Sequence, residues 1–291
     1  FTPLLLTSIA FAVAAKAGAF NVGVEGEVFL GGITAAYIGI NWTFLPKPAL
    51  YVACFVGAMV VAAAWALIPA VLRAYYNVNE VCTTILMNTV ALYITSYLVS
   101  GPMSAGTANA QSLPVTVRLY QFMKPSSVNV GIFIAAITVI VIIFMLQKSS
   151  WGYKIRTVGL NPTHADYVGI DSKKVFVGAM MLSGMLGGMA GCIEVLGVHG
   201  YFLNNFATGL GSNGMLAALI VKNNMVSTPF MAFFLAVLKS GAMGMQQSTG
   251  VPKSLVDTIT AVFIIIATME TAFQFTKKRK KKTEEKKEDK A

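Results

Sequence analysis

The run "LYVACFVGAMVVAAAWALIPAV", Leu50–Val71, contains no charged residue and decides the fold class. A helix that crosses the hydrocarbon core of a membrane needs roughly 20 apolar residues. Because lipid offers no hydrogen-bond partners, the backbone N–H and C=O groups of such a run bond one another, as they do in a helix. The whole chain has 56% hydrophobic and 12% charged residues, against roughly 25% charged in soluble proteins. We therefore expect an all-α, polytopic membrane protein.

Further apolar runs predict about nine transmembrane helices, some of them short. They are Thr2–Ala15, Val28–Ile40, Leu50–Val71, Thr83–Val99, Val128–Leu146, Val175–Leu196, Met215–Val221, Pro229–Met245 and Leu255–Phe275. The sequence begins at Phe1, without a methionine and inside an apolar run. We therefore expect that an N-terminal helix is missing from it. The predicted organisation is a transmembrane domain over 1–276 and a tail over 277–291.

Basic residues orient the chain, because loops rich in Lys and Arg stay in the cytoplasm. The loop 147–174 is basic. The tail "KKRKKKTEEKKEDK" has nine bases and four acids, so its net charge of +5 is half of the formal net charge of +10. Both segments, including the C-terminus, are predicted to be cytoplasmic. A tail of this composition is expected to be disordered and to contact lipid headgroups, with a specific regulatory role as the alternative. This distribution of charge does not suggest a nucleic-acid partner.

Weak internal similarity indicates an inverted repeat. "VEGEVFLGG" resembles "SNGMLAALI", and "VNEVCTTILMNTVALYI" resembles "VPKSLVDTITAVFIIIA". Under the predicted topology the paired segments run in opposite directions, an arrangement typical of transporters with a path between the halves. Chance similarity among apolar helices is the alternative.

Several polar residues fall inside or beside the apolar runs. Glu25 and Glu27, in "FNVGVEGEVF", stand where glycines open a short helix. Both can cap free amides at the positive end of that helix. Alternatively one of them, Glu25 rather than Glu27, fixes the packing of a broken helix beside a path. Glu194 is costly in lipid, so it is expected to face a wet cavity or to pair at a subunit interface.

Asparagines near the same runs offer paired donors and acceptors. Asn88, Asn204 and Asn213 are the candidates for lining a path. With phenylalanine and tyrosine rings nearby, they would suit an uncharged, polar solute that carries an aromatic ring. Helix capping and hydrogen bonds between helices are the alternative roles.

Enzymatic chemistry finds little support. Cys54, Cys82 and Cys192 lack metal-ligand spacing, and His164 and His199 stand without a triad or metal partner. "GLGSNG", 209–214, lacks the strand and helix context of a dinucleotide site. The sequence has no phosphate-binding loop of the G-x-x-x-x-G-K-[ST] type, so we expect neither a metal site nor ATP hydrolysis by this chain.

The basic loop carries the most informative pattern, "WGYKIRTVGLNPTHADYVGI", 151–170. Asn161–Val168 predicts a short amphipathic helix with Pro162 in its first turn. Gly159 and Gly169 bracket that helix and are interpreted as hinges. A short helix of this kind on the inner face is a suitable contact for a soluble partner.

This loop resembles the coupling loop of ABC importer permeases of the branched-chain amino acid, ribose and nucleoside superfamily. The matching residues in the loop are Gly152, Lys154, Arg156, Gly159, Asn161, Ala165, Tyr167, Gly169 and Ile170, and those in the span that follows it are Ser183, Gly184 and Gly191. The resemblance implies that an ATPase is contacted by Gly159, Asn161, Pro162, Ala165, Asp166, Tyr167 and Gly169. Asp166 stands where alanine is usual, which leaves open how that face meets the ATPase.

The opening stretch and "NEVCTTILMN", Asn79–Asn88, resemble further segments of the same superfamily and favour its nucleoside permeases. The resemblance implies a bacterial cytoplasmic membrane, a second homologous permease, ATPase domains that hold ATP and magnesium, and a substrate-binding lipoprotein outside. It implies no cofactor on this chain. Ribose-type sugars or branched-chain amino acids are the alternative substrates. A secondary transporter is the alternative class, and it would need a coupling-ion site rather than a docking loop.

Overall fold

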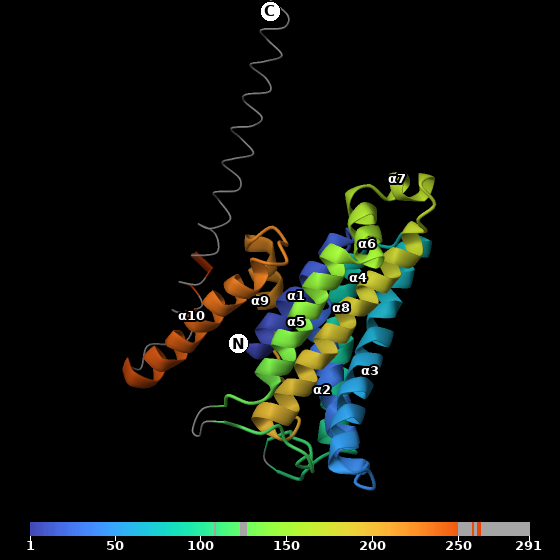
Figure 1. Ribbon diagram of the computed structural model, residues 1–291. Helices are drawn as coiled ribbons and strands as arrows, with labels where there is room; N and C mark the ends of the chain where they lie inside the picture. Colours follow the sequence, from blue (N-terminus) through green and yellow to red (C-terminus); the bar gives the residue numbers. More distant parts are fainter. Residues whose placement is uncertain (108, 123–126, 250–257, 259–260, 263–291) are drawn as a thin grey trace, which may run out of the picture. The chain divides into compact units, whose positions relative to one another are not determined.

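The computed structural model describes residues 1–291 apart from 108, 123–126, 250–257, 259–260 and 263–291. The chain divides into two compact units, Phe1–Phe233 and Phe234–Ala291. The described residues form helices joined by loops, with isolated β-bridges and no sheet. The first unit, in which the candidate site lies, contains a bundle of packed helices (Figure 1).

The helices follow the expected order. Their bounds are α1 Thr2–Lys16, α2 Val24–Asn41, α3 Lys47–Tyr76, α4 Glu80–Ser100, α5 Gly131–Lys148, α6 Ser150–Leu160, α7 Pro162–Tyr167, α8 Ser172–Glu194, the π-helical turn η1 Val195–His199, α9 Leu210–Ile220 and α10 Thr228–Thr249. The expected helix Leu255–Phe275 lies outside the described residues apart from Thr258, Ala261 and Val262, and the tail 277–291 lies outside them entirely.

Five of these helices are long and apolar enough to cross a membrane, namely α3, α4, α5, α8 with η1, and α10, while α1 and α9 are shorter apolar helices. Apolar side chains on α3 remain exposed at a spacing of four residues, with Val52 63%, Val56 47% and Val60 55% exposed. In a soluble protein such a stripe would be buried. The prediction of an all-α, polytopic membrane protein is confirmed.

Helix α8 lies at the centre of the first unit, and its glycines bring it close to two neighbours. A β-carbon at Gly184 would lie 2.7 Å from the carbonyl oxygen of Ala62 on α3, and one at Gly188 would overlap Ala58. On another face, a β-carbon at Gly191 would overlap the carbonyl oxygen of Val28 on α2. Small residues at such spacings let helices approach closely in a membrane. The pairs Gly184–Ala62 and Gly188–Ala58 make α8 antiparallel to α3. A β-carbon at Gly187 would lie 2.8 Å from Cβ of Glu27, and this contact together with that of Gly191 makes α8 parallel to α2.

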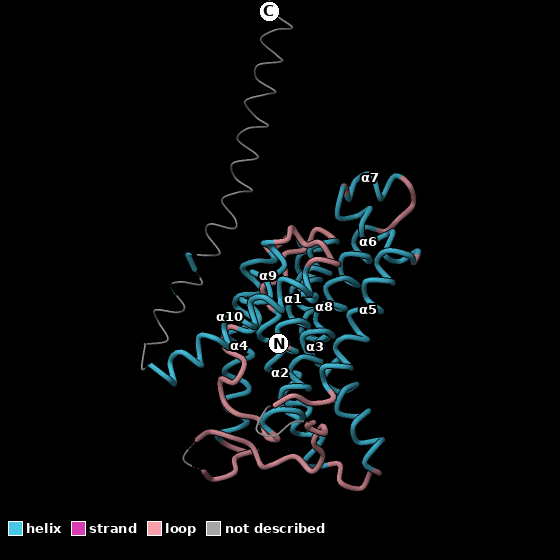
Figure 2. Tube along the Cα trace, turned by 60° about the vertical axis from the view of Figure 1, so that its left-hand side comes forward, coloured by secondary structure: helices cyan, strands magenta, loops and turns pink. Residues whose placement is uncertain are grey.

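The two ends of the bundle differ. The loop between α4 and α5 (pink in Figure 2) lies at the end opposite α7. There it runs antiparallel to residues 196–204: Ser112 N donates to Phe202 O at 2.8 Å and Leu119 N to Leu196 O at 2.9 Å. The end with α6 and α7 carries the basic side chains Lys16, Arg73, Lys148, Lys154, Arg156, Lys173, Lys174 and Lys222. This is the distribution expected of a cytoplasmic face.

Candidate functional site

Helix α2 starts inside the bundle rather than at its end. After α1 the chain turns at Gly18, whose φ is 80°, a value that glycine adopts without strain. The connection 17–23 then runs back along α1, which places the ring of Phe20 5.0 Å from the ring of Phe11 in an edge-to-face contact. The first backbone amides of α2 therefore face the interior, where they need partners.

Helix α9 also starts inside the bundle. The hydroxyl of Thr7, in the middle of α1, donates to the carbonyl oxygen of Leu210 at 3.2 Å. A β-carbon at Gly214 would lie 2.8 Å from the backbone nitrogen of Ser8. From there α9 runs to Ile220, towards the end that carries Lys16. The preceding residues 200–209 thus bring the chain back into the bundle without regular helix.

The starts of α2 and α9 meet. The hydroxyl of Ser212 donates to Glu25 Oε2 at 3.3 Å, and a β-carbon at Gly211 would lie 2.6 Å from the backbone nitrogen of Glu25. Helix starts carry partial positive charge and unpaired N–H groups. Two of them beside one half-buried carboxylate form a polar centre, of which Ser212 is exposed at the surface of the described chain. Glu25 and Asn213, both expected on a path, are thereby on adjoining helix turns.

Asn88 bonds the backbone on both sides of the α2 start. Its Oδ1 accepts from the N–H of Gly26 at 2.8 Å, and its Nδ2 donates to the carbonyl oxygen of Val22 at 2.9 Å. This is the bridging role that the sequence left as an alternative to lining a path. Asn88 therefore holds α4 against the start of α2.

The buried acid of this region is Glu27, which sequence reasoning had placed second to Glu25. Glu27 is 1% exposed, and its Oε1 accepts from Asn21 Nδ2 at 2.8 Å. The same amide nitrogen donates to Ser183 Oγ on α8 at 2.9 Å, and Asn21 Oδ1 accepts from the N–H of Gly23 at 2.9 Å. Glu27 Oε2 has no hydrogen-bond partner among the described residues.

The sequence contains a signal for this network, namely the close spacing of its polar residues and glycines. Asn21, Gly23 and Glu27 all lie in the quoted stretch "FNVGVEGEVF". A β-carbon at Gly187 would lie 2.8 Å from both Cβ and Oε2 of Glu27, so the glycine-rich part of α8 provides the room for this carboxyl group.

Three other candidate residues have partners within the chain. Glu194 ends α8, its side chain is 16% exposed, and its Oε1 lies 3.8 Å from His199 Nε2. Asn204 Oδ1 accepts from Ser96 Oγ on α4 at 2.8 Å. The side-chain amide of Asn213 donates to the carbonyl oxygen of Gly209, one turn back. Glu194 and Asn204 belong to the end of the bundle opposite α7, apart from the meeting point of α2 and α9.

The predicted short helix of the basic loop is present as α7. Asn161 caps it by accepting from the N–H of His164 at 3.0 Å, and Pro162 is its first residue. Ala165 is fully buried, whereas Leu160 and Tyr167 are 88% and 86% exposed. Helix α7 is thus held by a small buried residue, while Leu160 at the end of α6 and Tyr167 at the end of α7 present large apolar side chains outward. Large exposed apolar groups on one surface are typical of an interaction site.

The carboxylate of Asp166 is engaged within the chain. Its Oδ1 accepts from the N–H of Ser172 at 3.0 Å, and its Oδ2 accepts from the hydroxyl of Ser172 at 3.0 Å. Beside it, Asp171 caps α8 by accepting from the N–H of Lys174 at 3.0 Å. That hydrogen bond and the Lys174 side chain hold the pKa of Asp171 below its usual value. Asp166 therefore closes the turn between α7 and α8.

Gly159 is not a hinge, contrary to the interpretation of the sequence. It lies inside the continuous helix α6, and a β-carbon there would overlap the carbonyl oxygen of Lys16 at the end of α1. Gly18 faces it, because a β-carbon at Gly18 would lie 3.6 Å from Gly159 Cα. Glycine is needed here for close approach of two backbones. Gly169, with φ of 79°, does turn the chain after α7.

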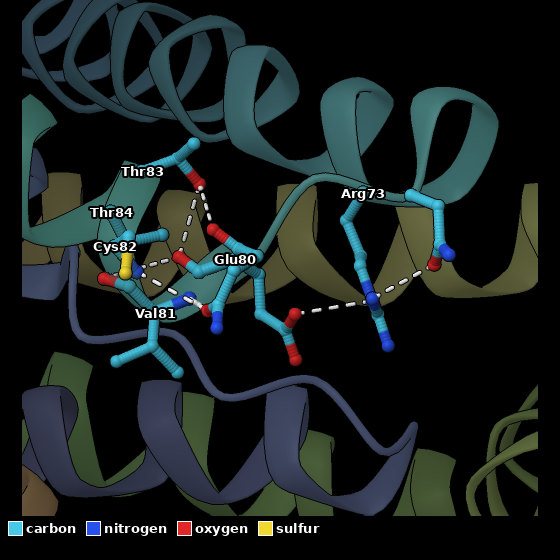
Figure 3. A network of polar contacts seen from close by, with 8 residues as sticks. Arg73, Glu80, Val81, Cys82, Thr83 and Thr84 are labelled. Atoms are coloured by element: carbon cyan, nitrogen blue, oxygen red, sulfur yellow. Dashed lines mark hydrogen bonds and ion pairs between the residues drawn. The ribbon is translucent and has the colours of Figure 1, made fainter.

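The connection between α3 and α4 is fixed at the same end (Figure 3). Arg73 Nε lies 3.1 Å from Glu80 Oε2, and Arg73 Nη1 donates to Asn77 Oδ1 at 3.0 Å. Asn79 caps α4 by accepting from the N–H of Val81 at 2.9 Å. A capped and ion-paired start sets the position of α4, and with it the side chain of Asn88 that reaches α2.

Comparisons with known proteins agree with this architecture. Residues 1–268 match the family described as branched-chain amino acid transport system / permease component. The guanosine ABC transporter permease protein NupP of Bacillus subtilis is 33% identical, over 97% of this chain and 82% of the relative. The glucose ABC transporter permease protein TsgB13 of Haloferax volcanii is also 33% identical, over 90% and 72%. The nucleoside ABC transporter permease protein NupB of Lactococcus lactis is 30% identical, over 90% and 75%.

No solved structure matches the chain. The family match covers the whole bundle described above, including the meeting point of α2 and α9 and the loop that carries α7. The chain therefore belongs to the family of permease components of branched-chain amino acid transport systems.

Proposed function

We propose that this chain forms half of a nucleoside path in an ATP-driven importer. The observation that carries the proposal is the similarity, over 97% of this chain, to a permease named for guanosine. Relatives named for nucleosides are 30% and 24% identical. The choice of nucleosides as substrate thus comes from the relatives, and the arrangement of polar groups where α2 and α9 meet supports it.

The meeting point of α2 and α9 suits a neutral polar solute. Its donors are backbone amides at two helix starts, and its acceptor is the half-buried carboxylate of Glu25. Such dipoles can replace water around a solute without holding it as a fixed charge would. Aromatic side chains lie beside this region: the ring of Phe206 is 5.7 Å from that of Phe29 and 5.2 Å from that of Phe202. We assign to Phe206 a contact with the flat base of a nucleoside.

Helix α7 is proposed as the contact with the ATPase subunit. Leu160 and Tyr167 would enter a groove of that subunit, while Asp166 keeps the turn rigid through Ser172. A movement of α7 would move α6, which directly precedes it. Because Gly159 of α6 contacts the backbone of Lys16, the end of α1 would then move as well. The connection 17–23 then leads to Asn21, which is bonded to the first turn of α2 through Glu27.

The remaining partners follow from the same assignment. A substrate-binding lipoprotein would dock on the opposite end, where Leu113 and Tyr120 of the α4–α5 loop are 47% and 70% exposed. A second, related permease would complete the path, and ATP with magnesium would be held by the ATPase subunits. This chain is proposed to bind no cofactor, and its C-terminal tail to lie in the cytoplasm.

Uptake by cells that carry the chain with its copurifying subunits tests the substrate. Radiolabelled guanosine should accumulate in an ATP-dependent manner, and excess uridine or adenosine should compete with it, whereas excess leucine should not. A chain in which Leu160 and Tyr167 are both replaced by serine serves as the uncoupled control. Accumulation of leucine in place of nucleosides would refute the proposal.

Sugar transport is the second candidate, because one relative with 33% identity is named for glucose. The polar centre described above would also solvate a sugar, since it needs only donors and acceptors. A contact of the substrate with Phe206 distinguishes nucleoside transport from sugar transport, because a sugar has no flat base to stack on the ring. Phe206→Leu should reduce nucleoside uptake several-fold if a base stacks on it, and should leave the uptake of a sugar nearly unchanged.

A further inference from the structure

A basic pocket opens at the end of the bundle that carries α6 and α7. It has a volume of about 390 Å³, within the range of roughly 300–1,000 Å³ found for small-molecule sites. Three cationic side chains line it, namely Lys16 at the end of α1, Arg156 on α6 and Lys222 after α9. Apolar walls are supplied by Leu146, Val221 and Met225.

The three cations have no acidic partner among the described residues. The carboxylates at this end are otherwise occupied: Glu80 pairs with Arg73, Asp171 with Lys174, and Asp166 with Ser172. None of them lines the pocket. Three like charges that face one cavity repel one another, so an anion that enters it gains from all three at once.

The depth of the pocket indicates the kind of anion. Lys16 is the last residue of α1, and Leu146 lies in the last turn of α5. The pocket is thus level with the ends of apolar helices, where the headgroups of the cytoplasmic leaflet lie. A basic pocket between transmembrane helices on that side is suited to an anionic headgroup, and the apolar walls suit the glycerol and the first methylene groups.

The local backbone is shaped to bring Lys222 to this place. Lys222 and Asn223 both have left-handed φ values, 54° and 56°, which are uncommon outside glycine and costly to hold. They turn the chain sharply after α9, between Val221 and Asn224. Arg156 is fixed from the other side, because its Nη1 donates to the carbonyl oxygen of Leu146.

We propose that this pocket binds the phosphodiester of an anionic phospholipid, with Lys16, Arg156 and Lys222 around the phosphate. The site would tie α1, α6 and the turn after α9 together through one lipid. Since α6 connects α7 to α1, the bound lipid would also brace the contact through which the chain meets its ATPase. That consequence rests on the proposed function, whereas the binding site itself does not.

Native mass spectrometry of the full chain, purified from membranes with its copurifying subunits, tests the site. The probe is phosphatidylglycerol, compared with phosphatidylcholine and with glycerol 3-phosphate. We expect one retained phosphatidylglycerol that millimolar glycerol 3-phosphate does not displace. Binding of glycerol 3-phosphate as tight as that of the lipid would overturn the lipid assignment in favour of a free phosphate ester.

The double variant Lys16→Gln, Lys222→Gln should bind phosphatidylglycerol about thirtyfold more weakly, since each basic residue near an anionic lipid contributes roughly fivefold in affinity. Lys148→Gln is the matched control, because Lys148 lies at the same end but outside the pocket. Without added lipid the melting temperature of the double variant should be no lower than that of the control, because two charges that repel one another have been removed. This comparison separates lost binding from misfolding. Equal binding by the double variant and the control would refute the site, and so would a double variant that is unstable before lipid is added. Lipid retention is measured independently of uptake, so a failure of the nucleoside assignment would not affect the test of the lipid site.

Discussion

Gly159 lies directly against the carbonyl oxygen of Lys16, so that the backbone of α6 touches the end of α1 with no side chain between them. The contact joins the segment around α7 to the connection that leads to the start of α2. That segment holds Leu160 and Tyr167, the two most exposed large apolar side chains among the described residues. The structure thus provides a short, stiff route from a surface to the polar centre inside the bundle.

Gly159→Leu should break that route. The added side chain cannot fit against Lys16, so α6 must move away from α1. We expect ATP hydrolysis to continue in the assembled complex while uptake per ATP hydrolysed falls at least tenfold (~1.4 kcal/mol of coupling). The measurement is the ratio of nucleoside uptake to ATPase activity, both normalised to assembled complex.

Gly169→Asn is the control for that experiment. It changes a glycine of the same loop where an added β-carbon meets nothing within 4 Å, and asparagine tolerates a left-handed φ. It should keep the coupling ratio of the unchanged chain. An equal loss of coupling in both variants would show that the loop, and not the contact with α1, is the sensitive element.

Asn88→Leu should reduce the amount of folded protein. The substitution leaves the N–H of Gly26 and the carbonyl of Val22 unpaired, and each buried unpaired group costs roughly 1–3 kcal/mol. The melting temperature of the purified chain should therefore fall by several degrees. Asn41→Leu is the same change at an exposed residue of α2 whose one recorded side-chain hydrogen bond among the described residues is to Tyr37, and it should shift the melting temperature little. A stable Asn88→Leu protein with slow uptake would instead favour a direct contact with substrate.

Glu27→Gln should be tolerated, while Glu27→Ala should destabilise the chain. Glutamine keeps an acceptor for Asn21 and puts a neutral amide in place of a buried carboxylate whose Oε2 has no hydrogen-bond partner among the described residues; burying a neutral polar group costs less than burying a charge. Alanine leaves a cavity and removes one of the two acceptors of the Asn21 amide nitrogen, together about 2–5 kcal/mol. Thermal unfolding compares the two variants. If Glu27→Gln proves as unstable as Glu27→Ala, the carboxyl group itself, rather than its hydrogen bond, is what the fold requires.

The apolar runs predicted the described helices other than α6 and α7, since hydrophobic length decides where a chain spans a membrane. Capping chemistry placed α7 correctly, because Asn161 and Pro162 act locally. The sequence did not reveal that Gly159 touches Lys16, and it left a bridging role of Asn88 as one of two alternatives, because both contacts join segments distant in the chain. Nor did it rank Glu27 above Glu25, since the turn at Gly18 decides which acid faces Asn21.

The complex should contain two different permeases. The helix starts of α2 and α9 lie within one chain, but a path through the membrane needs a second wall that faces them. Among the relatives, Lactococcus lactis has two nucleoside ABC transporter permease proteins, NupB, 30% identical to this chain, and NupC, 24% identical. Native mass measurement of the purified complex should give one copy of this chain and one of a related permease. Two copies of this chain and no other permease would contradict the prediction.

Glu25→Gln should slow nucleoside uptake without affecting assembly. Glu25 is half-buried, and its one recorded side-chain partner among the described residues is Ser212, at the long distance of 3.3 Å. Little folding energy therefore depends on it, whereas the loss of its charge changes the field at two helix starts. We expect several-fold slower uptake per assembled complex and an unchanged melting temperature. Glu80→Gln is the control, because it also removes an acid but at a residue that pairs with Arg73 away from the polar centre. This variant should lower the free energy of unfolding slightly, by about 0–1 kcal/mol. It should leave nucleoside uptake per assembled complex unchanged. Equal uptake in Glu25→Gln and the unchanged chain would place the path elsewhere and leave the meeting of α2 and α9 with a purely structural role.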